Sequence, residues 1–369
     1  MIYLDYNATT PIDRTVVEAM LPYLYGNFGN PSSSHALGAA AKDAIEKARS
    51  QVAGLLNCSP SEIIFTSGGS ESNNMAIKGV AFTYQHKGRH IITSKIEHPA
   101  VINPCRYLER LGYQISYLPV DQYGIIDPAG VEKLITDRTI LVTVMHSNNE
   151  TGALQPIGEI SRICHKHHIL LHTDASQSVG KVSVDVQKLG VDFLTMAGHK
   201  LYAPKGIGAL YIRKGTDIEP LIHGAGHEGG RRAGTENIVY DVALGKACEI
   251  AAEALKSPAV KQLTDYFYQC LREKFKDRIH LNGHPEKRLP NTLNISFLGH
   301  SGQALLSRLD NIAASTGSAC HSGLPTLSPV LKAMGVSLEV GLGAVRFSLG
   351  RYTTKAEIDT VMEKLGLII

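Results

Sequence analysis

Two charged side chains follow predicted strands and could together hold a reactive carbonyl cofactor. Asp174 closes the apolar run Ile169–Asp174, and Lys200 stands 200 − 174 = 26 positions later, after the apolar run Phe193–Met196. Because the carboxyl ends of parallel strands share one edge of a sheet, we expect both side chains to face one crevice. A lysine amine can attach to the aldehyde of pyridoxal phosphate, while a carboxylate keeps the pyridine nitrogen protonated. Taken singly, the two residues would suit a helix cap and a surface lysine.

A glycine-rich turn between a predicted strand and a predicted helix could bind a phosphate group. Its sequence is Thr66-Ser67-Gly68-Gly69-Ser70-Glu71-Ser72-Asn73-Asn74. The glycines let backbone amides approach an anion, Ser70 offers a hydroxyl, and the N-terminus of the following helix adds a favourable dipole. Alone, the turn would equally suit a tight bend with a helix cap. Together with Lys200 and Asp174, it favours the phosphate of pyridoxal phosphate.

One cysteine lies in a segment whose composition is typical of a surface loop. Small, polar and turn-forming residues surround Cys320 from Ala314 to Pro325, which predicts an exposed thiol rather than the buried apolar filler that free cysteines usually form. The neighbouring His321 could lower the pKa of the thiol as an imidazolium, or it could be a solvated loop residue. The other five cysteines lack paired spacing and indicate free thiols in a reducing compartment.

Composition excludes several other classes of protein. The chain has 369 residues, a hydrophobic content of 43% and a formal net charge of +3, which is ordinary for a globular protein of two domains. We expect no nucleic-acid partner, because no basic run is interleaved with aromatic residues. We expect no membrane span and no signal peptide, and therefore a cytoplasmic protein. The histidines from His165 to His172 straddle a predicted helix end and the next strand, so a zinc site is disfavoured and no metal is expected.

Short β-branched runs alternate with helical spacing between Ser59 and Arg213. The predicted strands are Ile63–Thr66, His90–Ser94, Gln114–Val120, Ile140–His146, Ile169–Asp174, Phe193–Met196 and Gly208–Ile212. Predicted helices between them include Ser72–Tyr84, Ala100–Leu111 and Ile157–His167. Several strands are apolar on both faces, which indicates the α/β class with a mostly parallel sheet covered by helices.

The pattern changes after Asn237 and predicts a smaller α+β domain. Its predicted elements are the helices Ala243–Leu255, Lys261–Phe275, Gln303–Leu309 and Lys355–Leu365 and the strands Thr292–Phe297 and Ala344–Ser348. We place the boundary near residue 250, with residues 10–250 as the large domain and residues 1–9 and 251–369 as the small domain that carries the Cys320 loop.

Motifs along nearly the whole chain resemble the cysteine desulfurases of the NifS/IscS-like family of fold-type-I pyridoxal-phosphate enzymes. The motifs are Tyr3-Leu4-Asp5-Tyr6-Asn7-Ala8-Thr9-Thr10, Gly29-Asn30-Pro31-Ser32-Ser33, His146-Ser147-Asn148-Asn149-Glu150-Thr151-Gly152 and Arg346-Phe347-Ser348-Leu349-Gly350-Arg351. Two positions depart from the family pattern: Ala197 replaces a serine of some members, and His321 stands where many members have Thr or Ser.

The resemblance implies a set of site residues. It implies that Lys200 holds the cofactor as a Schiff base, that Asp174 pairs with the ring nitrogen, and that His98 stacks on the ring with a catalytic role. It places the other cofactor contacts at Gly69, Ser70, Asn149, Gln177, His199 and Thr235, the last reaching the phosphate of a partner subunit. It implies that Asn149 and Arg346 bind substrate, with Arg346 clamping the carboxylate, and that Cys320 accepts sulfur as a persulfide while alanine leaves.

The resemblance also implies partners and leaves alternatives open. The substrate is L-cysteine or, as in the related selenocysteine lyases, L-selenocysteine; the enzyme is a homodimer and hands its sulfur to an unidentified acceptor protein. The chain ends at Ile369 without the tail by which housekeeping desulfurases engage an iron–sulfur scaffold, so we expect weak or no binding to one. An ordinary aminotransferase would leave Cys320 without a role, and a partner-binding protein without turnover would not need these residues. Whether Arg231 or Arg232 touches substrate stays open.

Overall fold

A seven-stranded sheet organises the larger part of the protein. The structure is a computed structural model that describes residues 1–316 and 327–369. The strands of the sheet are β2 (Ile63–Thr66), β3 (His90–Ser94), β4 (Gln114–Leu118), β5 (Thr139–Thr143), β6 (Leu170–Asp174), β7 (Phe193–Ala197) and β8 (Gly208–Ile212). Their order is β2-β8-β7-β6-β5-β3-β4; β8 is antiparallel to β2 and β7, and the other neighbouring pairs are parallel. The predicted α/β class with a mostly parallel sheet is therefore confirmed.

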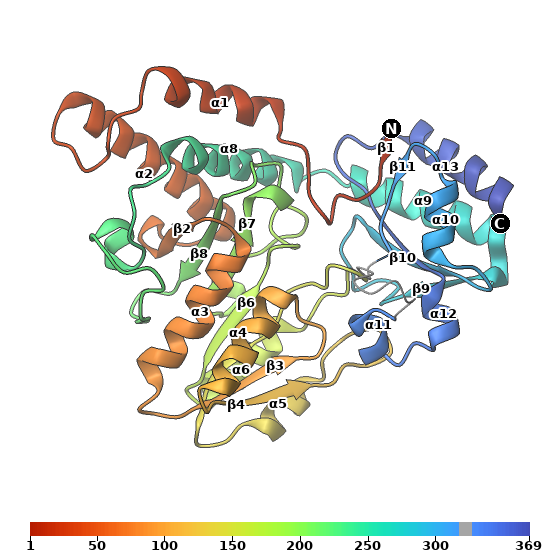
Figure 1. The fold of residues 1–369 in the computed structure, drawn as a ribbon, viewed down its shortest axis with the longest axis horizontal. Helices are drawn as coiled ribbons and strands as arrows, with labels where there is room; N and C mark the ends of the chain where they lie inside the picture. Colours follow the sequence, from red (N-terminus) through yellow and green to blue (C-terminus); the bar gives the residue numbers. More distant parts are fainter. Residues whose placement is uncertain (317–326) are drawn as a thin grey trace.

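Helices cover both faces of this sheet (Figure 1). They are α1 (Arg14–Tyr25), α2 (Ala36–Leu56), α3 (Gly69–Tyr84), α4 (Pro99–Arg110), α5 (Pro128–Leu134), α6 (Ile157–Lys166), α7 (Val186–Leu189) and α8 (Ile238–Ala254), with short 3₁₀ turns at η1 (Pro60–Glu62), η2 (Gly198–Lys200) and η3 (His227–Gly230). Neighbouring residues of one strand pack into different apolar clusters: Ile63 and Phe65 lie with α2 and α8, whereas Ile64 lies with α3 and α4. This alternation follows from the two-residue period of a strand and explains why both faces need a helical cover.

The smaller part has its own sheet and its own apolar core. It contains α9 (Ala259–Phe275), η4 (Lys276–Arg278), β9 (Ile279–Asn282), β10 (Thr292–Phe297), α10 (Gly302–Arg308), β11 (Ile312–Ala313), α11 (Pro329–Ala333), α12 (Leu338–Leu342), β12 (Ala344–Ser348) and α13 (Lys355–Ile368). The sheet has the order β12-β10-β9 and is antiparallel. Four phenylalanines, Phe267, Phe275, Phe297 and Phe347, are fully buried in its core. Both ends of the chain lie in this part (Figure 1).

The N-terminal segment connects the two parts. Strand β1 (Ile2–Tyr3) pairs in parallel with β11, and Leu4 belongs to the core of the smaller part. A few residues later, Thr10 donates from its backbone amide to the carbonyl oxygen of His199 in the larger part (3.0 Å). The division into residues 10–250 as the large domain and residues 1–9 and 251–369 as the small domain stays a prediction.

The boundaries of several elements differ from those predicted. Helix α3 begins at Gly69, three positions before the predicted start at Ser72, and α8 begins at Ile238 instead of Ala243. Both starts were missed because Gly69 and the residues around Asn237 resemble loop residues until a side-chain cap or a neighbouring strand fixes them. In α8 that cap is Asn237, whose side chain accepts a hydrogen bond from the amide of Tyr240.

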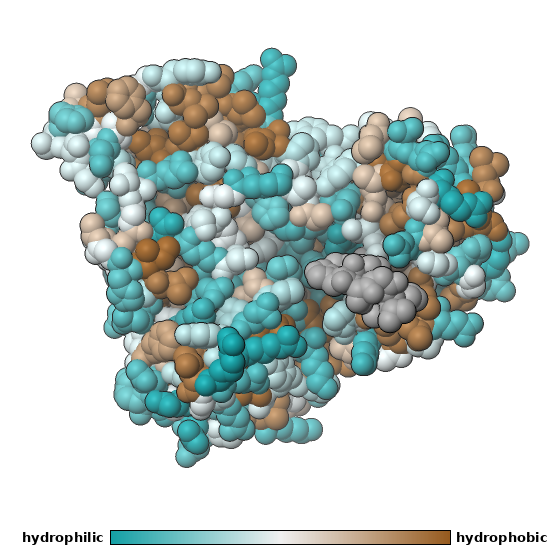
Figure 2. Space-filling model, in the orientation of Figure 1, coloured by the Kyte–Doolittle hydropathy of each residue, from teal (hydrophilic) through white to brown (hydrophobic). Residues whose placement is uncertain are grey.

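Apolar side chains gather on the outer surface of α1 (Figure 2). Leu24, Tyr25 and Phe28 are 54%, 81% and 73% exposed, and Ile12, Val17, Leu21 and Leu37 are also exposed. We call these seven residues the α1 patch. No helix within residues 1–316 and 327–369 is long and apolar enough to cross a membrane.

Candidate active site

A cavity of about 440 Å³ opens at the carboxyl edge of the seven-stranded sheet. We call it the central cavity. It brings together most of the residues singled out from the sequence: Gly69, Ser70, His98, Asn149, Asp174, Gln177, His199, Lys200 and Arg346 all line it. Asp174 is the last residue of β6, and Lys200 ends the 3₁₀ turn that follows β7. The expectation that strand ends would gather these side chains in one crevice is therefore correct in its geometry.

Lys200 is held by backbone oxygens rather than by a carboxylate. Its Nζ donates to the carbonyl oxygens of Asn7 (2.5 Å) and Ala8 (2.7 Å). Burial and the nearby Arg346 together lower the pKa of Lys200 to about 8, against the opposing effects of Asp5 and Asp174. A lysine with such a pKa has a substantial neutral fraction near neutral pH, and the neutral amine is the nucleophilic form.

Asp174 is buried and oriented by two hydrogen bonds. One oxygen accepts from the Asn73 side-chain amide (2.7 Å) and the other from the backbone amide of Ser176 (2.9 Å). Neither partner carries a positive charge, and Asp174 forms no ion pair within the described residues. Asn73 lies in the first turns of α3, and its role was not predicted because its contact with Asp174 spans 101 positions. The carboxylate is thus fixed in place, and it can still accept a hydrogen bond from a group bound in the cavity.

The glycine-rich turn has the geometry of an anion cradle. Gly68 adopts φ +143°, a region that favours glycine, and α3 starts at the next residue. A Cβ added at Gly69 would lie 3.0 Å from Ser176 Oγ and 3.4 Å from the Ala197 Cβ. The first amides of a 16-residue helix and the Ser70 hydroxyl therefore face a space that larger side chains would fill.

Two imidazoles line the cavity in different roles. His98 caps α4, where its Nδ1 accepts from the backbone amide of Ala100 (3.1 Å); in the neutral ring the proton is then on Nε2. Burial lowers the pKa of His98, Asp174 raises it, and Lys200 lowers it. His199 lies 3.2 Å through Nδ1 from Thr9 Oγ1, and burial together with Lys200 lowers its pKa to about 4. Both rings are therefore neutral at physiological pH.

Arg346 in β12 reaches the cavity from the smaller part of the protein. Its Nη2 pairs with Asp5 (2.7 Å) and its Nη1 donates to the carbonyl oxygen of Asn149 (3.0 Å), while Nε is buried without a partner among the described residues. Asp5, for which no role was predicted, thus holds the guanidinium in place. The Nε–H group of Arg346 therefore remains a hydrogen-bond donor without a partner in the described part of the chain, although Nη1 and Nη2 are already hydrogen-bonded.

Lys181 is a second amine close to Lys200 that the sequence did not single out. Its Nζ donates to Asn7 Oδ1 (2.9 Å) and Gln177 Oε1 (2.8 Å). Burial lowers its pKa well below the ordinary value, and the charges of Lys200 and Arg346 add to this effect. The Asn7 side chain and backbone therefore bind both lysines. The only sequence signal for Asn7 is its place in the Tyr3–Thr10 motif.

Of the predicted residues Thr235, Cys320 and His321, the structure describes only Thr235. Thr235 is exposed and does not line the central cavity. Cys320 and His321 lie outside the described residues. Of the two open arginines, Arg232 pairs with Glu71 (2.9 Å), next to the glycine-rich turn.

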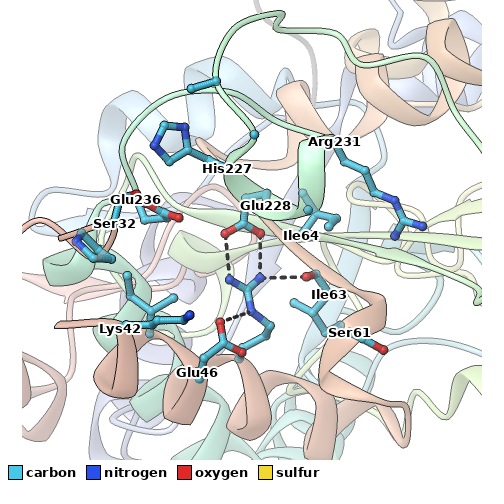
Figure 3. A pocket seen from close by; sticks show the side chains of 16 residues that line it. Ser32, Lys42, Glu46, Ser61, Ile63, Ile64, His227, Glu228, Arg231 and Glu236 are labelled. Carbon is cyan, nitrogen blue, oxygen red and sulfur yellow. Dashed lines mark hydrogen bonds and ion pairs between the residues drawn. The ribbon is translucent and has the colours of Figure 1, made fainter. Parts of the chain in front are cut away.

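A larger cavity of about 800 Å³ lies between α2, the strand β2 and the turn η3 (Figure 3). We call it the side cavity. Its central contact is a buried ion pair in which Arg49 Nη1 and Nη2 donate to the two carboxylate oxygens of Glu228 at 2.6 and 2.8 Å. Arg49 also donates to the carbonyl oxygen of Ile63 (2.8 Å), and Glu228 accepts from the amide of Phe65 (2.9 Å). Arg49 and Glu228 neutralise each other, whereas the Oε2 atom of Glu236, which also lines this cavity, is buried without a partner among the described residues. The buried Arg49–Glu228 pair identifies the centre of the side cavity as a structural joint.

The central cavity fits pyridoxal phosphate on the chemistry of its donors. It offers an amine for the aldehyde, a carboxylate without a cation for the pyridine nitrogen, and a helix N-terminus with a hydroxyl for the phosphate. The side-chain oxygen Oδ1 of Asn73 is buried without a partner among the described residues. Such an unsatisfied acceptor beside Asp174 is consistent with a site built to receive a polar group.

This fold and this donor set define a fold-type-I pyridoxal-phosphate enzyme. Residues 2–361 match the model of the family described as aminotransferase class-V, and the chain belongs to that family. The match confirms the fold class and the cofactor that the sequence predicted.

Curated relatives and solved structures agree with this assignment. The chain is 49% identical to cysteine desulfurase IscS of Dictyoglomus turgidum, across all of this chain and 94% of the relative, and 48% identical to cysteine desulfurase IscS of Methanosarcina thermophila, across all of this chain and 92% of the relative. A solved NifS-like protein superimposes with a TM-score of 0.93 at 40% identity, covering all of this chain and 98% of its own. A structure described as SspA in complex with cysteine gives 0.86 at 39% identity over 96% and 100%. The recognition as a NifS/IscS-like desulfurase relative is confirmed, and these names give no support to the selenocysteine alternative.

Proposed function

We propose that this protein is a cysteine desulfurase that converts L-cysteine to L-alanine and retains the sulfur as a persulfide on Cys320. The observation that carries the proposal is the meeting of Lys200, Asp174 and Arg346 in one cavity of about 440 Å³. A small amino acid fits this volume. Full-length similarity to proteins named cysteine desulfurase supports the choice of substrate.

The site residues singled out from the sequence in the central cavity each have a task in this reaction. Asp174 would hold the pyridine nitrogen, Gly69, Ser70 and His199 the phosphate, and His98, Asn149 and Gln177 the ring. When bound, pyridoxal phosphate supplies an electron sink for the substrate's α-carbon. Lys200, whose pKa is lowered to about 8, takes the α-proton as a neutral amine. Arg346 binds the substrate carboxylate with the donors that Asp5 and Asn149 leave available.

The sulfur acceptor is inferred by elimination among the six cysteines. Cys58, Cys105, Cys164, Cys248 and Cys270 are described, and none lines the central cavity. Burial raises the pKa of Cys58, Cys105 and Cys164 to about 12 and that of Cys248 higher still, so these thiols are poor nucleophiles. Cys320 is the cysteine that this comparison leaves. Its thiolate attacks the substrate sulfur, the carbon–sulfur bond breaks with its electrons on carbon, and a proton completes alanine.

Product analysis tests this proposal. Purified holoenzyme is supplied with L-cysteine and a reductant, and alanine and sulfide are quantified. Cys320→Ala should lose both products, whereas the matched control Cys58→Ala should keep both. L-Selenocysteine in a parallel reaction measures the substrate preference as a ratio of kcat/KM values. Full sulfide release by Cys320→Ala would show that the persulfide assignment is wrong.

The predicted homodimer and its cellular setting belong to the same proposal. Thr235 is exposed and outside its own cavity, as expected of a residue that reaches the phosphate of a partner subunit. The α1 patch offers an apolar surface that a second copy would cover. Light scattering should give twice the mass of 39.9 kDa, and Thr235→Ala should weaken cofactor binding without changing that mass. We further propose a cytoplasmic location and an unidentified protein that accepts the sulfur.

A further inference from the structure

A third cavity of about 450 Å³ lies between the two parts of the protein, behind the central cavity. We call it the rear cavity. Its walls come from Gly180–Ser183, from Lys200–Tyr202, from the start of α9 and from the segments before β10 and after β12. Lys200 contributes to both cavities, and the segment from Tyr6 to Thr10 separates them. The rear cavity has no task in the proposed reaction.

The walls of the rear cavity carry only positive charges. Lys181, Lys200, Lys261, Arg288 and Arg351 line it, and no aspartate or glutamate does so among the described residues. Asp265 and Asp13 pair from outside the cavity with Lys261 (2.6 Å) and Arg351 (3.0 Å). The other three cations have no carboxylate partner in the described part of the chain. Lys181 and Lys200 donate instead to neutral oxygens of Asn7, Ala8 and Gln177. Of the three, Arg288 therefore keeps a donor without a partner among the described residues.

Arg288 is the cation of the rear cavity whose donors are least satisfied. Its Nη1 is buried and has no hydrogen-bond partner among residues 1–316 and 327–369. The guanidinium lies over the ring of Tyr268 at 5.3 Å, which fixes its plane without using its N–H donors. A buried unpaired donor is costly, and a carboxylate is the group that satisfies a guanidinium best.

Apolar side chains form most of the remaining walls, beside the polar residues Thr10, Ser183, Ser257 and Asn291. Leu201, Leu255, Pro258, Val260 and Leu349 contribute aliphatic surface, and Tyr6 and Tyr202 contribute aromatic surface. A volume of about 450 Å³ is typical of pockets that bind small organic molecules. An amino acid is a poor fit, because its ammonium group would meet cations and no carboxylate. Inorganic phosphate would leave the apolar walls uncovered.

We propose that the rear cavity binds a small organic carboxylate that has an apolar body and no ammonium group. The carboxylate meets the guanidinium of Arg288, and the body covers the aliphatic and tyrosine walls. This site is distinct from the central cavity, because Arg288 does not line the latter.

Isothermal titration of the holoenzyme with 4-phenylbutyrate and with its neutral amide tests the proposal. The carboxylate should bind with a dissociation constant on the order of 0.1–1 mM, and the amide at least tenfold more weakly. Arg288→Gln should weaken binding of the carboxylate about tenfold. Lys287→Gln, the same change of charge at the exposed neighbour outside the cavity, should leave it unchanged.

A second variant covers the case in which Arg288→Gln does not fold. Lys261 is largely exposed, with 64% of its side chain accessible, so Lys261→Glu should fold and should weaken carboxylate binding by repulsion. The proposal is overturned if the carboxylate does not bind at 10 mM, if acid and amide bind equally, or if the folded cavity variants bind like the wild type.

Discussion

The side cavity and the central cavity treat their charges in opposite ways. In the larger side cavity, Arg49 and Glu228 form two short hydrogen-bonded contacts and cancel each other (Figure 3). In the smaller central cavity, Lys200 and Asp174 form no ion pair within the described residues and rest on neutral amide and carbonyl groups. The two cavities therefore differ in whether their central charges are paired, and this difference, not their volume, distinguishes the candidate active site from the structural joint. Each of the following changes would break or sharpen this contrast.

Removing the amine of the central cavity should have the largest effect. Lys200→Ala should lower alanine release by about 10⁴-fold or more, because it removes both the cofactor's attachment point and the proton acceptor. Borohydride trapping and peptide mapping should find the cofactor on Lys200 in the wild type and no such adduct in the variant. Lys205→Ala, at an exposed lysine nearby, serves as the control. An adduct that persists in Lys200→Ala would show that the cofactor is attached to another residue and would contradict the assignment of the central cavity as its site.

Breaking the ion pair of the side cavity should affect stability rather than chemistry. Arg49→Met leaves the Glu228 carboxylate buried, with 3% of its side chain exposed, and should lower the free energy of unfolding by about 3–5 kcal/mol. Glu228→Gln in the same background should restore part of the loss, since it removes the charge and keeps an acceptor for the Phe65 amide. Urea denaturation measures both. Unchanged stability with lost cofactor binding would contradict the structural role.

Beside the central cavity, neutralising a buried charge should stabilise the protein. Glu150 accepts from Ser328 Oγ (2.5 Å), and burial raises its pKa to about 7. The folded state therefore holds a proton that the unfolded state loses near pH 4.5, so the contribution of Glu150 to stability falls as the pH rises from about 4.5 to 7 and is constant above pH 7. Glu150→Gln should abolish this decline. Its free energy of unfolding relative to that of the wild type should therefore be up to about 3 kcal/mol greater at pH 8 than at pH 5. Parallel pH profiles of the two proteins would disprove the shift.

The smallest expected effect concerns the readiness of Lys200. The rate at which the apoprotein captures pyridoxal phosphate should rise with pH around a midpoint near 8, because only the neutral amine reacts. Arg346→Gln removes a nearby positive charge and should move the midpoint up by about one unit. Asp5→Asn should move it down. Absorbance in a stopped-flow instrument follows the capture, and shifts in one direction for both variants would exclude an electrostatic origin.

The sequence predicts the sheet well and the contacts across it poorly. Strands β2, β3 and β8 have the predicted bounds because buried apolar runs are bounded by turn residues on both sides. The long helix α2 was not predicted, although Ala41, Ile45, Ala48, Val52 and Leu56 recur at helical spacing and are buried. This spacing is sufficient to predict a helix over these residues.

Other features could not be read from one sequence. The antiparallel direction of β8 leaves no mark on its residue pattern, since a fully buried strand looks the same either way. The roles of Asn73 and Lys181 depend on partners brought together by the sheet order, and nothing in their immediate neighbours signals a hydrogen bond to Asp174 or Asn7. The residue types at the strand ends predict the central cavity. The groups that hydrogen-bond to these residues depend on the order of the strands in the sheet and are not predicted.

The pairing of β1 with β11 joins residues about 310 positions apart, Ile2 with Ile312 and Tyr3 with Ala313. During synthesis, β1 cannot pair with β11 until residues 312 and 313 have been made. The same opening stretch supplies the two carbonyl oxygens that hold Lys200. We therefore expect the central cavity to form late in the folding of the protein.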